Sequence, residues 1–232
     1  MTEARTSSSS AAQRQLALDL GHRPAFGRED FLVSEGNQAA VEWIDRWPDW
    51  PGHVLALFGP AGCGKSHLAQ VFALRAQAIA IAAPDLSAES VGTLLAKYRA
   101  FLVEEGNACD ERALFHLFNG VRESKGSLLL TGREPPARWP TELPDLKSRL
   151  SSIPAVPISP PDDALMEAVL VKLFSDRQLV VGPDVIAYVL RRIDRSFAAA
   201  RQLVATADKE SLAGKRPITI PLMKTIIGEE IA

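Results

Sequence analysis

The sequence predicts an α/β protein in which a parallel sheet of five strands is followed by a small domain made only of helices. From Phe31 to about Ile158, short apolar runs alternate with longer helical stretches, which is typical of a parallel sheet. Pro157, Pro160 and Pro161 then mark a boundary, and no convincing strand-like alternation follows them. The 232 residues, 47% hydrophobic and 23% charged, are enough for both parts.

Five short apolar runs are the expected strands: Val54–Phe58, Ala78–Ala82, Ala100–Val103, Leu128–Thr131 and Ala155–Ile158. The helices expected around them are Gln38–Trp47, Ser66–Gln77, Ser90–Tyr98 and Asp110–Ser124. In the last of these, Leu114, Leu117 and Val121 recur on one helical face. Asp110 is suited to cap its start and Gly126 to end it.

Beyond the prolines, four amphipathic helices are expected: Asp163–Ser175, Asp184–Ile193, Phe197–Leu212 and Ile220–Ile231. The chain is therefore expected to divide into an N-terminal tail (1–27), an α/β domain (28–158) and a helical domain (159–232). Residues 1–14 are rich in Ser and Ala and show no periodicity, so we expect this stretch to be disordered.

A glycine-rich loop lies between the first expected strand and the helix after it. It reads Gly59-Pro60-Ala61-Gly62-Cys63-Gly64-Lys65-Ser66 and matches the pattern G-x-x-x-x-G-K-[ST]. In this setting the glycines let backbone N–H groups turn inward around a polyphosphate at a helix N-terminus. Lys65 would neutralise the β- and γ-phosphates, and the Ser66 hydroxyl would help to hold Mg²⁺. The full motif and both flanks favour a nucleoside phosphate site over a Gly-rich turn without a ligand.

A phosphate loop of this kind requires a second, carboxylate site at the tip of a neighbouring strand. Glu104 and Glu105 directly follow the apolar run Ala100–Val103. We expect Glu104 to share the metal with Ser66, and Glu105 to polarise the attacking water. The usual first acid is aspartate, so Glu104 departs from the pattern by one methylene. Paired surface glutamates are common after strands, and this interpretation therefore depends on the phosphate loop.

Composition and charge narrow the function further. The net charge of −2 and the isoelectric point near 6.1 weigh against a constitutive nucleic-acid binder, which usually has a basic surface stripe. The densest basic group consists of Arg191, Arg192 and Arg195. A solvated helix face explains this group at least as well as a nucleic-acid site does. Cys63 and Cys109 suggest no disulfide framework and a reducing compartment. With no membrane-length apolar run and no signal peptide, we expect a cytoplasmic protein without membrane contact.

The N-terminal segment contains one abrupt apolar cluster, Gln15-Leu16-Ala17-Leu18-Asp19-Leu20. Gly21 and Pro24 follow at once, which favours a short linear element on a tether over a first strand of the fold. In such an element the amide of Gln15 can be held by polar groups, while Leu16, Leu18 and Leu20 fill an apolar pocket on a partner. The alternative is a stray apolar cluster in a tail.

Several motifs occur in a fixed order along the chain: Phe31-Leu32-Val33 with Asn37, the phosphate loop extended through His67 to Leu68, F-L-V-E-E (Phe101–Glu105), L-F-H-L-F-N (Leu114–Asn119), L-L-L-T-G (Leu128–Gly132) and D-L-K-S-R (Asp145–Arg149). Together they resemble the AAA+ module of the bacterial replication initiator DnaA. The resemblance runs from about Phe31 to the C-terminus. The Gln15–Leu20 cluster, T-G-x-x-P-P at Thr131–Pro136 and L-P-D-L-x-S-R at Leu143–Arg149 are more similar to the DnaA-related Hda family.

The resemblance implies a P-loop NTPase fold of the AAA+ type with a helical lid, holding ATP or ADP with Mg²⁺. The residues it implies for the nucleotide are the eight of the phosphate loop with Phe31, Leu32, Val33, Asn37 and His67. It also implies two partners, DnaA and the sliding clamp (the β subunit of DNA polymerase III), with DNA contacted only through the clamp. Gln15–Leu20 would bind the clamp, and the protein would stimulate hydrolysis of DnaA-bound ATP and so suppress re-initiation of replication. A homodimer is compatible with this.

The resemblance assigns Arg149 as an arginine finger acting in trans. A guanidinium presented across an interface stabilises charge on the γ-phosphate in the transition state, worth about 10³–10⁵ in rate for GTPases. By position alone, a surface arginine near the domain boundary is the favoured interpretation of Arg149, and the motif reverses this preference.

Two positions depart from the family pattern, so it stays open whether the protein is itself an enzyme. Arg133 stands where the family usually has an acidic sensor, and Ala198 stands where its lid has a second sensor arginine. Arg201 lies one helical turn further on and could replace that contact. We expect a nucleotide that is mainly structural, with weak or no intrinsic hydrolysis. The alternatives are an adaptor that positions DnaA or helicase without affecting hydrolysis, and an autonomous loader ATPase.

Overall fold

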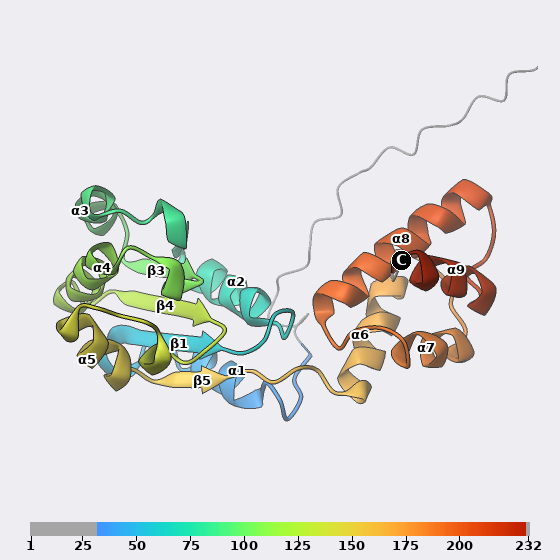
Figure 1. Ribbon diagram of the computed structural model, residues 1–232, viewed down its shortest axis with the longest axis horizontal. Coiled ribbons are helices and arrows are strands. Elements are labelled where there is room, and N and C mark those ends of the chain that lie inside the picture. The colour runs from blue at the N-terminus through green and yellow to red at the C-terminus, as the bar shows by residue number, and fades with distance from the viewer. Residues whose placement is uncertain (1–31, 231–232) are drawn as a thin grey trace, which may run out of the picture.

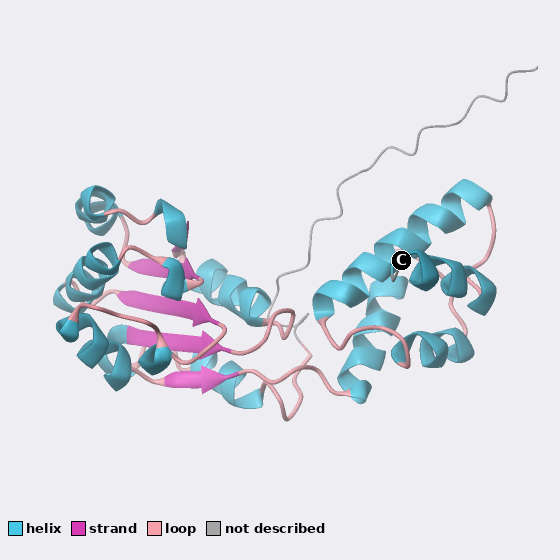
Figure 2. Ribbon diagram, in the orientation of Figure 1, coloured by secondary structure: helices cyan, strands magenta, loops and turns pink. Residues whose placement is uncertain are grey.

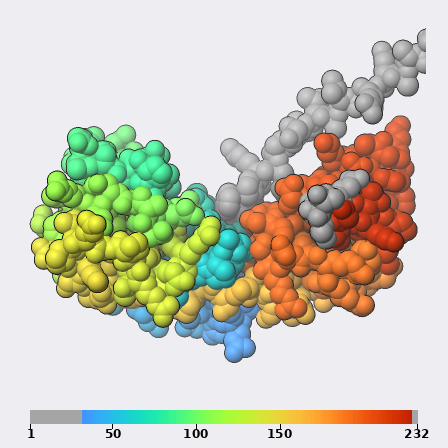
Figure 3. Space-filling view, viewed as in Figure 1, coloured from blue at the N-terminus to red at the C-terminus, as the bar shows by residue number. Residues whose placement is uncertain are grey.

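The computed structural model describes residues 32–230, so Phe31, the Gln15–Leu20 cluster and the first 14 residues lie outside the described part. Two bodies follow one another along the chain (Figure 1): a sheet covered by helices, and a cluster of helices that begins at Asp163. Their secondary structure differs as expected, since the second body contains helices and loops but no described strand (Figure 2). In the space-filling view, the body that contains the sheet touches the helical body near the segment coloured cyan (Figure 3).

The sheet has five strands in the order β2-β3-β4-β1-β5, and every pair is parallel. Its strands are β1 (Val54–Phe58), β2 (Ile79–Ala82), β3 (Ala100–Glu104), β4 (Ser127–Gly132) and β5 (Ala155–Pro157). The expected fold class is therefore confirmed, with strand ends that shift by one residue. In β3 the shift matters, because Glu104 belongs to the strand and pairs in register with Ala82.

Five helices flank the sheet: α1 (Gln38–Asp45), α2 (Lys65–Ala76), α3 (Ala88–Lys97), α4 (Glu111–Glu123) and α5 (Pro144–Ser152). Alternate residues of the strands face opposite sides. Leu55 and Leu57 pack with α1 and α2, whereas Val54 and Ala56 pack in the second core with α3, α4 and α5. The sheet is thus buried on both faces, which explains the nearly continuous apolar runs of its strands.

Local sequence explains where α4 begins and why α5 was not expected. The Asp110 carboxylate accepts a hydrogen bond from the Ala113 N–H (2.8 Å), which makes Asp110 the N-cap as expected. Helix α5 begins with Pro144 at its first position, and only Leu146 and Leu150 of its residues are buried. Two apolar residues four apart give too weak a periodic signal to indicate a helix.

The second body has its own core, which is separate from the two cores of the sheet. Its helices are α6 (Asp163–Asp176), α7 (Pro183–Leu190), α8 (Phe197–Gly214) and α9 (Ile220–Glu230). Fully buried side chains such as Leu170, Phe174 and Met223 fill the space between them. None of the described helices is both long enough and apolar enough to cross a membrane.

Candidate nucleotide site

The glycine-rich loop connects β1 to α2, so a strand, a loop and a helix follow one another as the motif requires. Gly59, Gly62 and Gly64 have positive φ angles of 153°, 75° and 105°. A Cβ atom on Gly59 would lie 2.2 Å from the carbonyl oxygen of Ile158. Glycine is therefore needed here both for the backbone conformation and for the close approach of the segment that follows β5.

Lys65, the first residue of α2, folds its side chain back over this loop. Its Nζ donates hydrogen bonds to the carbonyl oxygens of Gly59 (2.7 Å) and Pro60 (2.8 Å), and lies 3.9 Å from Cys63 Sγ. The ammonium group is thus held at the loop, where phosphate oxygens could replace the two carbonyls. Ser66 follows it, with its side chain exposed on the first turn of α2.

The two expected carboxylates lie at the same edge of the sheet as the phosphate loop. Glu104 ends β3, and in the strand order only β4 separates β3 from β1. The backbone N–H of Glu105 donates to Thr131 Oγ1 (3.2 Å), which attaches this turn to β4. Glu105 itself has a positive φ of 52° and an exposed side chain.

One oxygen of Glu104 has chemistry that fits a cation. Its Oε1 is buried and has no hydrogen-bond partner among the described residues. A buried carboxylate oxygen without a donor is costly, and a metal ion or metal-bound water would satisfy it. The side chains described in residues 32–228 hold no group of three or more His, Cys, Asp or Glu that could bind a metal. Mg²⁺ usually takes one or two protein ligands and completes its shell with phosphates and water, so the buried Glu104 oxygen is chemically suited to it.

The segment before α1 is held by Asn37 and lies beside the connection to the helical domain. The Asn37 side chain accepts from the Ser34 N–H (2.9 Å) and donates to the Leu32 carbonyl (3.0 Å). The neighbouring Gly36 carbonyl accepts from the Ser159 N–H (2.9 Å), directly after β5. Asn37 is thus engaged in shaping this turn, whereas Val33 is 49% exposed and available to a ligand. His67 is half-buried on the first turn of α2.

The helical domain touches the phosphate loop through the start of α8. The Phe197 N–H donates to the Gly62 carbonyl (3.0 Å). A Cβ atom on Gly62 would lie 2.4 Å from Ser196 Cβ, and one on Gly64 would lie 3.0 Å from the Phe197 ring. Sequence reasoning did not find this contact. The only signal for it was local: Ser196 is suited to cap a helix that begins at Phe197, and it does accept from the Ala199 N–H.

The positions that depart from the family pattern lie around this contact. Arg133 follows β4 directly and is exposed, and the Gly132 carbonyl before it accepts from the Gly59 N–H (3.2 Å). Arg133, at the position where the family usually has an acid, thus directly follows a residue that is hydrogen-bonded to the phosphate loop. Ala198 and Arg201 are both exposed on α8. The basic group nearby (Arg191, Arg192 and Arg195) is exposed but lies in the connection between α7 and α8, so the expected helix face is wrong, because α7 already ends at Leu190. Arg195 pairs with Asp163 (2.9 Å).

Arg149 lies apart from the phosphate loop. It is half-buried on α5, and its guanidinium stacks over the rings of Phe115 (5.1 Å) and Phe118 (5.6 Å) of α4. No acidic side chain described in residues 32–228 forms an ion pair with it. Helix α5 packs on the opposite face of the sheet from α2 and lies at the end of the α/β domain away from the helical domain (Figure 1). The guanidinium is therefore pre-oriented but does not serve the phosphate loop of its own chain.

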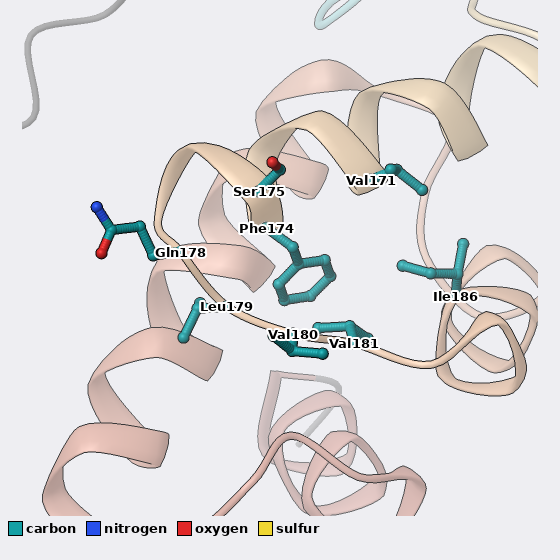
Figure 4. A pocket seen from close by; sticks show the side chains of 8 residues that line it. All are labelled: Val171, Phe174, Ser175, Gln178, Leu179, Val180, Val181 and Ile186. Atoms are coloured by element: carbon teal, nitrogen blue, oxygen red, sulfur yellow. The ribbon is translucent and has the colours of Figure 1, made fainter.

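A pocket in the helical domain has a different character. It lies where α6 ends and α7 begins (Figure 4), and its lining consists of Val171, Phe174, Ser175, Gln178, Leu179, Val180, Val181 and Ile186. Val171 is 52% and Val180 94% exposed. No charged side chain lines this pocket, so it offers nothing to a polyphosphate. The phosphate loop and the carboxylate edge of the sheet are the better nucleotide site.

Comparison with known proteins connects these features to a family. Residues 163–227 match the family model described as "Hda, lid domain". Domain III of the Thermotoga maritima replication initiation protein DnaA is similar over 89% of this chain and 97% of its own, with a TM-score of 0.78 and 16% identity. AMPPCP-bound DnaA from Aquifex aeolicus covers 83% of this chain and 67% of its own, with a TM-score of 0.70 and 18% identity. A Thermotoga maritima RuvB mutant covers 86% and 71%, with a TM-score of 0.69 and 14% identity.

At these identities the solved structures show the fold, which is that of AAA+ proteins. The match of residues 163–227, which span α6–α8 and most of α9, adds sequence evidence for a likeness to the Hda lid domain, and it includes Ala198, one of the two positions that depart from the family pattern. The chain therefore shares the fold of DnaA and RuvB, and its C-terminal helices are similar to the lid domain of Hda.

Proposed function

We propose that this protein is a negative regulator of DNA replication initiation that stimulates the hydrolysis of ATP bound to DnaA. The observation that carries the proposal is Arg149. Its guanidinium is stacked on two aromatic rings, has no acidic partner among the side chains described in residues 32–228 and lies away from the phosphate loop of its own chain. An arginine held in this way can enter the nucleotide site of another AAA+ protein. The match to the Hda lid family and the DnaA-like fold support DnaA as the proposed partner.

The phosphate loop is proposed to bind ATP or ADP. The Aquifex aeolicus DnaA structure contains AMPPCP, an adenine nucleotide analogue. In this chain the N–H groups of Gly59–Ser66 and the Lys65 ammonium would hold the phosphates, and Ser66 and Glu104 would hold Mg²⁺. The bound nucleotide would supply negative charge at the start of α2, where the helix dipole stabilises it. Glu105 would polarise the attacking water, and hydrolysis of ATP at this site is expected to be weak.

Arg149 would act on the ATP of the partner. Negative charge develops on the oxygens of the transferred phosphoryl group, and a planar guanidinium with its N–H donors unpaired can stabilise two of them at once. Stacking on Phe115 and Phe118 limits the rotamers of Arg149. Less conformational entropy is then lost when the interface forms.

The Gln15–Leu20 cluster is proposed to tether the protein to the DNA-loaded sliding clamp, so that DNA is contacted only through the clamp. Deleting Gln15–Leu20 should abolish clamp binding while nucleotide binding remains unchanged. Clamp binding that survives the deletion would remove the tether from the proposal. The protein is expected to work in the cytoplasm, and a homodimer remains compatible with the proposal.

The deciding experiment measures hydrolysis of DnaA-bound ATP with and without this protein and the DNA-loaded clamp. Arg149→Ala should bind clamp and nucleotide normally but fail to stimulate hydrolysis. Arg138→Ala is the matched control, because Arg138 is an exposed arginine that pairs only with Glu134. If Arg149→Ala stimulates fully, the assignment is wrong. If the wild-type protein binds DnaA without accelerating hydrolysis, an adaptor role replaces the proposed one.

A further inference from the structure

The first turn of α8 is completed by the phosphate loop rather than by its own chain segment alone. The first backbone N–H groups of a helix have no partner within the helix. At the start of α8, the Ser196 side chain accepts from the Ala199 N–H (3.1 Å) and the Gly62 carbonyl accepts from the Phe197 N–H (3.0 Å). The carbonyl of Gly62 therefore acts as a second cap, supplied by another domain.

The carbonyl groups of the phosphate loop divide between two partners. Those of Gly59 and Pro60 accept from Lys65, and that of Gly62 accepts from Phe197 of the lid. In a loop that surrounds a polyphosphate, the N–H groups point inward and alternate carbonyls point away. The hydrogen bond from Phe197 therefore depends on this conformation of the loop, although Phe197 itself does not need to contact the phosphates.

Gly62 is explained by this contact and not by the phosphate-loop motif. In the pattern G-x-x-x-x-G-K-[ST], Gly59 and Gly64 occupy the required glycine positions, whereas Gly62 occupies a free one. Its φ of 75° and the 2.4 Å that would separate an added Cβ from Ser196 Cβ leave room only for glycine. The Phe197 ring covers the next glycine of the loop, Gly64, at 3.0 Å from an added Cβ.

We propose that Phe197 is a positioning residue that couples nucleotide occupancy to the position of the lid, through its N–H bond to the Gly62 carbonyl and the packing of its ring on Gly64. The coupling does not need a lid cation, and so it operates although Ala198 stands at the sensor position. This inference rests on the proposed nucleotide site. It goes beyond that site because it assigns the coupling to a backbone group of the lid.

Two substitutions at position 197 separate the N–H from the ring. Phe197→Ala removes the ring and keeps the N–H, whereas Phe197→Pro removes both. Proline is well tolerated at the first position of a helix, and Ser196 has the extended conformation (φ −141°, ψ 142°) that a residue before proline prefers. The two variants therefore differ in the hydrogen-bond donor and in the proline Cδ, which takes the place of the N–H and prevents the Gly62 carbonyl from approaching at 3.0 Å. Phe197→Pro thus breaks this contact between the loop and the lid, whereas Phe197→Ala keeps its hydrogen bond. Circular dichroism checks that both variants retain the wild-type helix content.

The readouts are the affinity for a fluorescent ADP analogue and amide hydrogen exchange in the phosphate loop and in the first turn of α8. ADP should slow exchange in both segments of the wild-type protein. In Phe197→Ala this response should persist at reduced size. In Phe197→Pro it should be lost from α8, ADP affinity should fall about three- to tenfold relative to Phe197→Ala, and the two segments should exchange faster even without ADP.

Equal affinity and equal exchange in the two variants, with normal wild-type binding, would overturn the proposal and leave the nucleotide site intact. A wild-type protein with no affinity for ADP would overturn the site and the coupling together. The exchange rates without ADP would then still show whether the bond between Phe197 and Gly62 stabilises the lid contact.

Discussion

The phosphate loop and helix α5 belong to the same α/β domain, but their cations are in opposite situations. Lys65 donates to two carbonyl groups of its own loop, and the lid lies against that loop. Arg149 has no acidic partner among the side chains described in residues 32–228, rests on two aromatic rings and is not covered by the lid. A cation bonded to its own phosphate loop suits a resident ligand, whereas a cation without such a bond that lies away from this loop suits a partner's ligand. The first region is therefore interpreted as structural and the second as the effector.

The largest expected effect concerns helix α5 and its Arg149. Arg149→Ala should reduce the stimulated hydrolysis of DnaA-bound ATP by about 10³-fold, because the transition-state charge loses its guanidinium. Arg149→Lys should recover only part of the rate, since an ammonium group cannot form the planar, two-pronged contact. The melting temperature should change only modestly in both variants, because Arg149 is half-buried and its two cation–π contacts together are worth about 1–2 kcal/mol. A large loss of stability would instead indicate a structural role.

The next largest effect concerns the phosphate loop and its Lys65. Lys65→Ala should weaken ADP binding roughly 10- to 100-fold, because a charge-assisted contact to the phosphates is lost. Isothermal titration calorimetry measures the affinity directly. Stimulation of DnaA should fall less than in Arg149→Ala if the resident nucleotide is structural. Equal losses of stimulation in the two variants would contradict the division of roles between the two regions.

A smaller effect concerns the contact between the loop and the lid. Gly62→Ala should lower the free energy of unfolding by about 1–3 kcal/mol, because an alanine at φ 75° is strained and its Cβ would meet Ser196. Gly92→Ala is the matched control: Gly92 lies inside α3 and an added Cβ would have nothing within 4 Å, so alanine should stabilise the protein by about 0.5–1 kcal/mol. Chemical denaturation measures both changes. If both substitutions changed the free energy of unfolding in the same direction, the close approach of the lid to Gly62 would be contradicted.

The smallest effect concerns Cys109, which lies between β3 and α4 and belongs to neither region. Burial, with Asp110 as a second cause, raises the pKa of its thiol to about 11. At pH 7.5 the reactive thiolate should therefore be about 100-fold rarer than in an ordinary cysteine. Alkylation of Cys109, followed by mass spectrometry, should be slow at neutral pH and accelerate as pH rises toward 11. Fast alkylation near pH 7 would show that this segment opens.

The raised pKa of the Cys109 thiol also determines how the stability of the folded state changes with pH. The folded state holds the Cys109 thiol neutral above the pH at which the unfolded thiol ionises. Its contribution to folding is therefore present below about pH 9 and declines as pH rises toward the folded value of about 11. Cys109→Ser should flatten this part of the pH profile, which thermal melts between pH 8 and 11 can measure.

Much of the fold could be predicted because its signals are local. The five apolar runs, the N-cap at Asp110 and the four periodic segments after Pro161 each depend on a few neighbouring residues. Helix α5 was missed for the same reason, since only Leu146 and Leu150 are buried along it. The sequence also indicated that the phosphate loop and Glu104 share one edge of a parallel sheet, because both follow strands.

By itself, then, the sequence determined the α/β class, the lid and the residues around the phosphate loop, because the motif and the apolar periodicity are carried by short segments. Only the tertiary structure decided what those residues touch. The contact of Phe197 with Gly62 joins positions 135 residues apart, and Arg149 meets Phe115 and Phe118 only because α4 and α5 pack on one face of the sheet. Contacts between distant segments depend on the packing of whole elements, and no local pattern of residues encodes them.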